Sequence, residues 1–199
     1  MKNMYTTKQQ KSASIADESK KQDHRIGRFS KPKFENQIKR FMMNRVMRPL
    51  KQFLNELDLN PCTKPAYDLV LKENIKQAFK GSYPALKIDY TKLILSKGKL
   101  PNAPAISVCS PLSGKLVFRW TDNSGLRGTL ASDLLFVAVF NRACQRWVFK
   151  MDQAVRSDSH YSLDTSAFRG KLVQVYAGFI SEDSRRLSSS LYLGEVWVL

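Results

Sequence analysis

The stretch Lys115-Leu-Val-Phe-Arg-Trp-Thr-Asp-Asn-Ser-Gly125 decides the fold of this chain. Its bulky apolar side chains fall on alternate positions, which are Leu116, Phe118 and Trp120. An alternation with a period of two predicts a half-buried β-strand whose apolar side faces a core, with Lys115 and Arg119 on the solvated side. Residues 122–125 have the composition of an Asx-type turn, and we expect this turn to close a central hairpin.

Further strand signals follow at regular intervals, separated by turn residues such as Gly, Pro, Asn, Asp and Ser. We expect strands at residues 105–109, 116–120, 134–140, 146–151, 161–163, 172–180 and 192–199. About seven short strands in roughly a hundred residues are typical of an antiparallel β-sandwich of the immunoglobulin or fibronectin type III kind. The predicted fold class is therefore mainly β, with an α-helical N-terminal region before the sandwich.

The run Leu-Leu-Phe-Val-Ala-Val-Phe at residues 134–140 is apolar at every position. A strand buried on both faces has this composition, because neither set of alternating side chains meets water. We expect it to be a central strand, with one face covered by the preceding helical region.

That helical region begins where apolar residues start to recur at three- and four-residue steps. This stripe consists of Phe34, Ile38, Phe41, Met42, Met47, Leu50, Phe53, Leu54 and Leu57. Pro49 predicts a kink or a break after Arg48. A second helix is expected to end near residue 80, with Thr63 as its N-cap and Pro65 in its first turn. The two helices would form a hairpin, followed by extended chain over 86–95.

These patterns divide the chain into three parts. We expect a flexible basic tail at residues 1–33, a helical hairpin with a β connection at 34–102, and the β-sandwich domain at 103–199.

The charge of the chain is strongly positive. It has 33 Lys and Arg against 17 Asp and Glu, a net charge of +16, and thirteen of these sixteen charges fall in residues 1–100. Such a polarised basic half indicates a negatively charged partner, which could be nucleic acid, an anionic membrane surface or an acidic protein; a simply solvated lysine-rich surface explains it equally well. The candidate anion or nucleic-acid contacts lie on the first helix: Lys39, Arg40, Arg45, Arg48 and Lys51.

The three cysteines indicate neither a disulfide framework nor a zinc site, because they are odd in number and show no CxxC spacing. Cys109 and Cys144 lie in apolar strand-like stretches, and we expect them to be small buried thiols. The first residues lack the apolar segment of a signal peptide, and no run reaches the ~18 apolar residues of a membrane span. A cytoplasmic location is the default expectation, with signal-less export or assembly into a larger particle as alternatives.

Several blocks of this sequence are similar to a family known from Bacteroidota, catalogued as domain of unknown function 6266. The blocks are Ile88-Asp89-Tyr90, Leu95-Ser96-Lys97-Gly98, Phe118-Arg-Trp-Thr-Asp-Asn-Ser-Gly125, Gly178-Phe179-Ile180-Ser181 and Ser190-Leu-Tyr-Leu-Gly194. The resemblance covers about residues 34–199 and rests on the order and spacing of the blocks. The family has no established activity, so the resemblance supports the architecture and supplies no catalytic or binding residues.

Sequence motifs of enzymes are absent: there is no phosphate-binding glycine loop, no GxGxxG, no HExxH and no GxSxG. Cys144, His160 and Asp164 are the residue types of a nucleophilic catalytic arrangement, but nothing in the sequence orients them toward one another. The carboxylates Asp122, Asp133, Asp152, Asp158, Asp164, Glu182 and Asp183 fall in or beside turns, where backbone N–H groups are their expected partners rather than a calcium ion. We expect no catalytic residue, no metal and no cofactor.

The basic and aromatic residues of the strands do not predict a stacking surface for single-stranded nucleic acid. In residues 146–150, alternation places Arg146 and Lys150 on one face and Trp147 and Phe149 on the other. We therefore expect a non-enzymatic binding or assembly module with a protein partner or with copies of itself. The alternatives are a nucleic-acid-associated protein that uses its basic half, and an enzyme with an unrecognised site.

Overall fold

A computed structural model describes residues 31–56 and 65–199 of the chain. The chain forms two compact units, Met1–Gln37 and Ile38–Leu199, and the described part of the first unit is the beginning of helix α2 (Lys31–Met47). Everything that follows concerns the second unit. The predictions for residues 1–30 and for the N-cap Thr63 lie outside the described residues, as does Cys62, the third cysteine.

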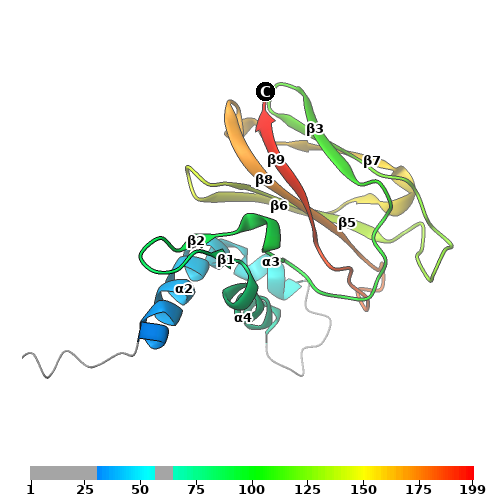
Figure 1. Cartoon of the computed structure of the whole chain (residues 1–199). Coiled ribbons are helices and arrows are strands. Elements are labelled where there is room, and N and C mark those ends of the chain that lie inside the picture. Colours follow the sequence, from blue (N-terminus) through cyan, green and yellow to red (C-terminus); the bar gives the residue numbers. More distant parts are fainter. Residues whose placement is uncertain (1–30, 57–64) are drawn as a thin grey trace, which may run out of the picture. The chain divides into compact units, whose positions relative to one another are not determined.

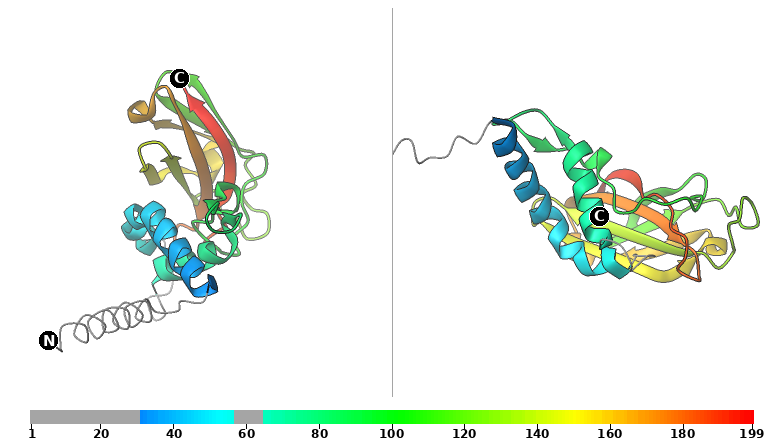
Figure 2. Two further views of the ribbon diagram at one scale, coloured as in Figure 1. Left: turned by 60° about the vertical axis from the view of Figure 1, so that its left-hand side comes forward. Right: turned by 90° about the horizontal axis from the view of Figure 1, so that it is seen from below.

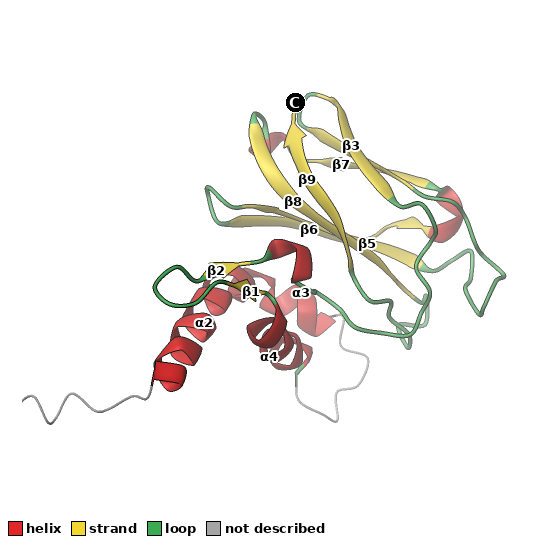
Figure 3. Ribbon diagram, viewed as in Figure 1, coloured by secondary structure: helices red, strands yellow, loops and turns green. Residues whose placement is uncertain are grey.

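Seven strands of the second unit form two antiparallel sheets (Figures 1 and 3). The first sheet has the order β3-β4-β7, and the second has the order β6-β5-β8-β9. Their bounds are β3 Ser107–Leu112, β4 Lys115–Arg119, β5 Leu134–Asn141, β6 Arg146–Val155, β7 His160–Asp164, β8 Lys171–Ile180 and β9 Leu191–Val198. The prediction of a seven-stranded sandwich of the fibronectin type III kind is confirmed, because this strand order with two facing sheets defines that fold.

Strand β4 has the predicted phase. Leu116 and Phe118 are fully buried, and the Trp120 side chain is only 6% exposed. Its indole Nε1 donates a hydrogen bond to the carbonyl oxygen of Arg156 at 2.7 Å. Lys115 and Arg119 are exposed on the opposite face, as the alternation requires.

The turn that follows β4 was predicted correctly in type and wrongly in role. The backbone N–H of Ser124 donates to Asp122 Oδ1 at 2.8 Å, which is the expected Asx turn. However, β4 pairs with β3 and β7, whereas the next strand β5 lies in the other sheet. The segment between them therefore crosses from one layer of the sandwich to the other and closes no hairpin.

Strand β5 is central and buried on both faces, as predicted. It pairs with β6 on one side and with β8 on the other. Leu135, Val137 and Val139 face the core between the two sheets, whereas Phe136 and Phe140 belong to a second apolar cluster on the outer face. A single strand thus contributes to two separate cores.

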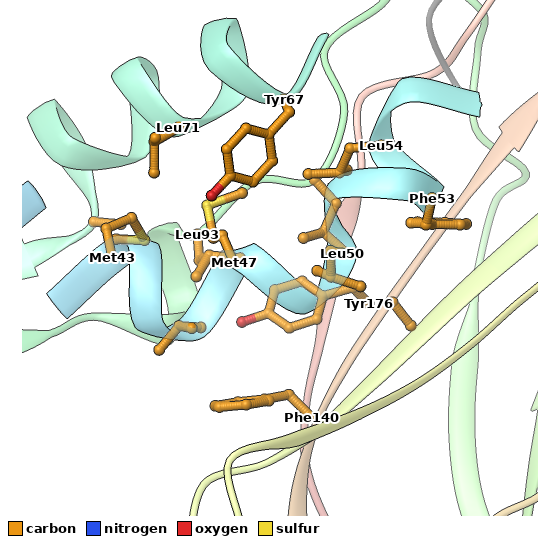
Figure 4. Close-up of a cluster of buried hydrophobic side chains, with 14 of the residues drawn as sticks. Met43, Met47, Leu50, Phe53, Leu54, Tyr67, Leu71, Leu93, Phe140 and Tyr176 are labelled. Carbon is orange, nitrogen blue, oxygen red and sulfur yellow. The ribbon is translucent and has the colours of Figure 1, made fainter. Parts of the chain in front are cut away.

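The outer core lies between the four-stranded sheet and the helices, and both Figure 1 and Figure 2 show α3 and α4 gathered at one side of the strands. In Figure 4, Leu50 lies close to Tyr176 of the sheet, whereas Met43 and Met47 lie on the side of their helix toward Tyr67 and Leu71. The helices are α2, the 3-10 helix η1 (Arg48–Leu50), α3 (Lys51–Glu56) and α4 (Ala66–Gln77). The break predicted at Pro49 is confirmed, because α2 ends at Met47 and Pro49 lies within η1.

The chain between the helices and the sandwich departs from its prediction. A strand pair exists, but it is short: β1 (Phe79–Lys80) pairs with β2 (Lys87–Ile88), and the 3-10 helix η2 (Tyr90–Lys92) follows. Residues 93–95 are not a strand. Their backbone bonds to side chains instead, since Asn74 Oδ1 accepts from the N–H of Ile94 at 2.9 Å and Asn74 Nδ2 donates to its carbonyl at 2.8 Å.

The two cysteines among the described residues are exposed, which corrects the expectation that they are buried. On β3 the alternation of side chains turns Val108 inward and Cys109 outward. Cys144 lies in the turn between β5 and β6, beyond the last buried position of β5.

Candidate binding groove

The second unit carries two grooves, besides a more open hollow of about 620 Å³ beside Pro49. Groove A, of about 1070 Å³, lies between α2, the β1–β2 pair with η2, the β5–β6 turn and the outer face of β8 and β9. Several of its polar groups contact one another. The guanidinium of Arg142 lies 5.0 Å from the centre of the Tyr90 ring and 3.6 Å from the Glu195 carboxylate, and the Tyr192 hydroxyl donates to Gln174 Oε1 at 2.7 Å.

Groove B, of about 670 Å³, lies between α4, residues 94–100 and the β8–β9 loop. Its apolar lining consists of Leu54, Ala66, Leu69, Val70, Ile94, Leu95, Leu100 and Leu187. Among its described lining residues, six are cationic and one is acidic. The cations are Lys72, Lys76, Lys97, Lys99, Arg185 and Arg186, and the acid is Glu73. Groove B thus combines an apolar floor with six cations and one carboxylate, whereas the lining of groove A has four cations and two carboxylates.

Helix α4 supplies one bank of groove B because of its residue spacing. Leu69, Lys72 and Lys76 are three and four residues apart, so they follow one another along one face of the helix. Leu69 is 49% exposed on this face. Leu71 and Asn74, on another face of α4, are buried and hold the helix to the protein.

Residues 94–100 supply the opposite bank and are fixed to the β8–β9 loop. The Ser190 hydroxyl accepts from the backbone N–H of Leu95 at 2.9 Å, and the N–H of Leu100 donates to the carbonyl oxygen of Leu187 at 3.1 Å. At Gly98 a Cβ would lie 1.7 Å from the same Leu187 oxygen, so no other residue fits there without a shift of the backbone. This bank is therefore a rigid structure and not a loose loop.

The rim cations keep most of their charge free for a partner. Lys97 lies 3.6 Å from Glu73, and Arg185 lies 4.0 Å from Asp183, but both pairs are solvent-exposed. Exposed ion pairs contribute only about 0–1 kcal/mol, so a partner can replace them readily. Hydrogen bonds from Ser181 and from the N–H of Arg185 keep the pKa of Asp183 below its usual range, because both stabilise the carboxylate.

The predicted anion contacts lie elsewhere and on more than one surface. Lys39 Nζ lies 6.0 Å from the centre of the Phe79 ring, and Arg40 is exposed on α2. Arg45 lines groove A, whereas Arg48 and Lys51 line a separate shallow depression beside Pro49. None of the five is among the residues that line groove B, and they stay a predicted contact set.

The imagined nucleophilic arrangement is not assembled. Cys144 precedes β6 and His160 follows it, so a ten-residue strand separates them, which is roughly 30 Å at ~3.3 Å per residue. The His160 ring nitrogen Nδ1 lies 2.9 Å from the carbonyl oxygen of Asp158 instead. Asp164 accepts from the N–H of Ser166 at 2.9 Å.

The expected role of the turn carboxylates is confirmed for Asp122, Asp158, Asp164 and Asp183, each of which accepts a backbone N–H close in sequence. Asp133 also accepts a nearby backbone N–H, from Leu130 at 3.0 Å, but it is fully buried and forms in addition an ion pair with Arg156, Nε to Oδ2 at 3.0 Å. Within the part of the chain that the structure describes, no three His, Cys, Asp or Glu side chains gather as a metal site. Likewise, no described helix is long and apolar enough to cross a membrane.

Groove B was not predicted from the sequence. Its charges come from three separate segments, and the largest separation in the sequence is about a hundred residues. Two local features of the sequence do point to parts of the groove: the helical spacing of Leu69, Lys72 and Lys76, and the alternation Lys97-Gly-Lys99. What the sequence does not show is that the Arg185-Arg186 pair lies against them.

The architecture places the chain in the class of fibronectin type III-like β-sandwiches that carry a helical cover on the four-stranded sheet. The chain belongs to the DUF6266 family, described as a family of unknown function, whose model matches residues 24–194.

Among solved structures, the fn3 domain of the human collagen alpha-1(XX) chain is similar over 52% of this chain and 88% of that one, with 13% identity and a TM-score of 0.37. The FN5 domain of Drosophila Lar is similar over 48% of this chain and 94% of that one, with 4% identity and a TM-score of 0.34. No curated protein matches the sequence.

Proposed function

We propose that this protein is a non-enzymatic binding or assembly module and that groove B holds its protein partner. One observation carries the proposal: the aliphatic floor of groove B, a hollow of about 670 Å³, is surrounded by six cationic side chains, and Glu73 is the one carboxylate among its described lining residues. Pockets that bind specific ligands have this combination of an apolar lining and a few charged groups at the rim.

Two further features support a binding role over a catalytic one. The residue types that could do nucleophilic chemistry, Cys144 and His160, lie at opposite ends of β6. In groove A, Arg142, Gln174, Tyr192 and Glu195 are bonded to one another within the four-stranded sheet and its β5–β6 turn, so these groups already have partners in the fold. Groove B is instead built on a rigid bank and leaves its polar groups at the surface.

The proposal can be tested with a photoreactive amino acid placed in the native host. Leu69 lies in groove B and is 49% exposed, and Leu112 is 60% exposed at the end of β3, outside the groove. We expect a discrete covalent adduct from position 69 and none from position 112. The adduct should disappear when the chain with the photoreactive residue at position 69 also carries K72E and K76E. Equal labelling from both positions, or no adduct from position 69, contradicts the proposal.

A second candidate function is sequence-independent nucleic-acid binding by Lys39, Arg40, Arg45, Arg48 and Lys51, which the net charge of +16 favours. Such binding weakens with salt, with a slope of about −0.9 in log affinity per phosphate contacted on double-stranded DNA. The test is a gel shift of DNA and RNA at ~50 mM salt, repeated with these five residues changed to Ala. Absence of a shift removes this candidate.

The cellular setting is also a proposal, and it rests on the sequence. The resemblance of the sequence blocks favours an origin in Bacteroidota, and the cytoplasm is the proposed location. Fractionation of host cells with an antibody to the protein tests the second point, and recovery in the culture medium contradicts it.

A further inference from the structure

We infer that the occupant of groove B is a short acidic segment of a partner protein that carries aliphatic side chains between its carboxylates. The inference rests on the proposed function and adds to it the chemistry of the partner. Three properties of the groove point to it: the number of its charges, their placement on facing banks, and the chemistry of the floor.

The number and placement of the cations require several negative charges in one partner. Lys72 and Lys76 lie on α4, Lys97 and Lys99 lie on the facing segment, and Arg185 and Arg186 belong to the β8–β9 loop. A ligand with a single anionic group can neutralise one bank and leaves the other unpaired. A segment with several Asp or Glu residues reaches both banks, and such complementary charge also speeds association.

The floor selects aliphatic side chains. All of its described apolar members are aliphatic, among them Leu69, Val70, Ile94 and Leu187. Nucleic-acid bases bind single-strand grooves by stacking on aromatic rings, and none of the described lining residues of groove B is aromatic. The floor therefore favours a peptide with Leu, Ile or Val over DNA or RNA.

The shape of the groove distinguishes a peptide from a membrane. Proteins that bind bilayer surfaces bury a protruding apolar face into the headgroup region. In groove B most of the apolar residues line a hollow between α4, residues 94–100 and the β8–β9 loop, which a flat anionic surface does not enter. The volume of about 670 Å³ lies in the ~300–1,000 Å³ range of specific pockets, which suits a few side chains of a narrow segment.

The test uses fluorescence polarisation with the full-length protein and four probes. The first is a labelled hexapeptide of alternating Glu and Leu; the others are Glu/Ser and Lys/Leu hexapeptides of equal length and a single-stranded DNA hexamer. Vesicles of phosphatidylglycerol are used in a parallel sedimentation assay. We expect the Glu/Leu peptide to bind at least about tenfold more tightly than any other soluble probe. The affinity should fall as salt rises, because exposed charges are screened.

The matched variants have the same change of net charge. K72E/K76E reverses two cations inside groove B, and R48E/K51E reverses two exposed cations outside it. We expect the first variant to lose at least about tenfold in affinity for the Glu/Leu peptide and the second to stay within about twofold. L69S, which keeps all charges, should also weaken binding, because it removes part of the aliphatic floor.

Each outcome decides one way. Equal binding of the Glu/Ser and Glu/Leu peptides overturns the inference. Tighter binding of the DNA hexamer than of the Glu/Leu peptide overturns it as well. So does sedimentation of the protein with the vesicles, if K72E/K76E abolishes that sedimentation. If the adduct at position 69 forms in cells while no acidic peptide binds, the proposed function stands and this inference fails. If neither is observed, both fail.

Discussion

The indole Nε1 of Trp147 donates a hydrogen bond to the carbonyl oxygen of Val46 at 2.8 Å, and the two residues are 101 positions apart in the sequence. The same ring is stacked on Phe140 with centroids 4.6 Å apart. This contact joins the end of α2 to the edge strand β6. It therefore connects the helical cover to the sandwich by a polar bond as well as by apolar packing.

The first prediction removes that bond and keeps the ring. W147F preserves stacking on Phe140 and leaves the Val46 carbonyl without its donor, so it should lower the free energy of unfolding by about 1 kcal/mol. Urea denaturation followed by circular dichroism measures the change. A variant as stable as the natural protein would show that the bond contributes nothing.

The second prediction concerns the strand phase of β4. W120A should cost on the order of 3–5 kcal/mol, because it removes a buried ring that also packs edge-on against Phe179. W197A is the matched control, since Trp197 is 57% exposed on β9 and its loss should stay within about 0.5 kcal/mol. Similar values for the two variants would contradict the burial that distinguishes them.

The third prediction concerns the buried ion pair. D133A leaves the Arg156 guanidinium buried without its carboxylate and should cost about 3–5 kcal/mol. The double variant D133L/R156M removes both charges and should recover a large part of that loss. Urea denaturation of the single and double variants gives the coupling free energy. If the double variant is less stable than D133A, the remaining bonds of Arg156 to Asn123 and Pro101 outweigh its charge.

Most of the sandwich could be predicted because its strands alternate with a period of two. Val108 and Cys109 show the limit of this signal, because the composition of an apolar strand does not say which neighbour faces inward. The wrong role of the 122–125 turn has a similar cause. A turn motif describes local backbone, whereas pairing in another sheet depends on residues far along the chain.

The fourth prediction concerns alkaline pH. Burial raises the pKa of Tyr176 above its ordinary value, and the neighbouring Tyr192, Tyr90 and Asp89 raise it further. In the unfolded chain this phenol ionises near pH ~10, so the folded state retains a proton that the unfolded state loses. Stability should therefore fall as pH rises above about 10.

In Y176F this difference in proton binding is absent, so the plot of unfolding free energy against pH should be less steep above pH ~10. The variant should be less stable at neutral pH by about 1 kcal/mol, because the hydroxyl donates to the Tyr90 carbonyl at 2.8 Å. Urea titrations at several pH values from 9 to 11 provide both quantities. Equal slopes in the two proteins would contradict the prediction.

The fifth prediction concerns the bank of groove B. G98A brings a methyl group onto the Leu187 carbonyl and should cost about 1–3 kcal/mol, with faster amide exchange at Leu100. G125A is the control, because a methyl there meets nothing within 4 Å and costs only its left-handed backbone, about 1–2 kcal/mol. Protection of Leu100 should be unchanged in G125A. Unchanged protection in both variants would show that the bank tolerates the shift.

Groove B could not be predicted for a related physical reason. Asn74 and Ser190 bind the backbone of residues 94–96 in place of a neighbouring strand, and side-chain bonds of this kind have no periodic pattern. The turn role of Asp133 was predicted, since it accepts from the N–H of Leu130. Its ion pair with Arg156 was not predicted, because the sequence beside a turn does not show that a distant arginine is buried against the same carboxylate.

The double role of β5 has a consequence for how the chain matures on the ribosome. Phe53 is synthesised 83 residues before Phe136, whose ring lies 6.2 Å from its own. Synthesis proceeds at ~5–20 residues per second, so the apolar stripe of the helices waits several seconds for its sheet. During that interval its apolar side chains lack the sheet surface that buries them in the folded protein.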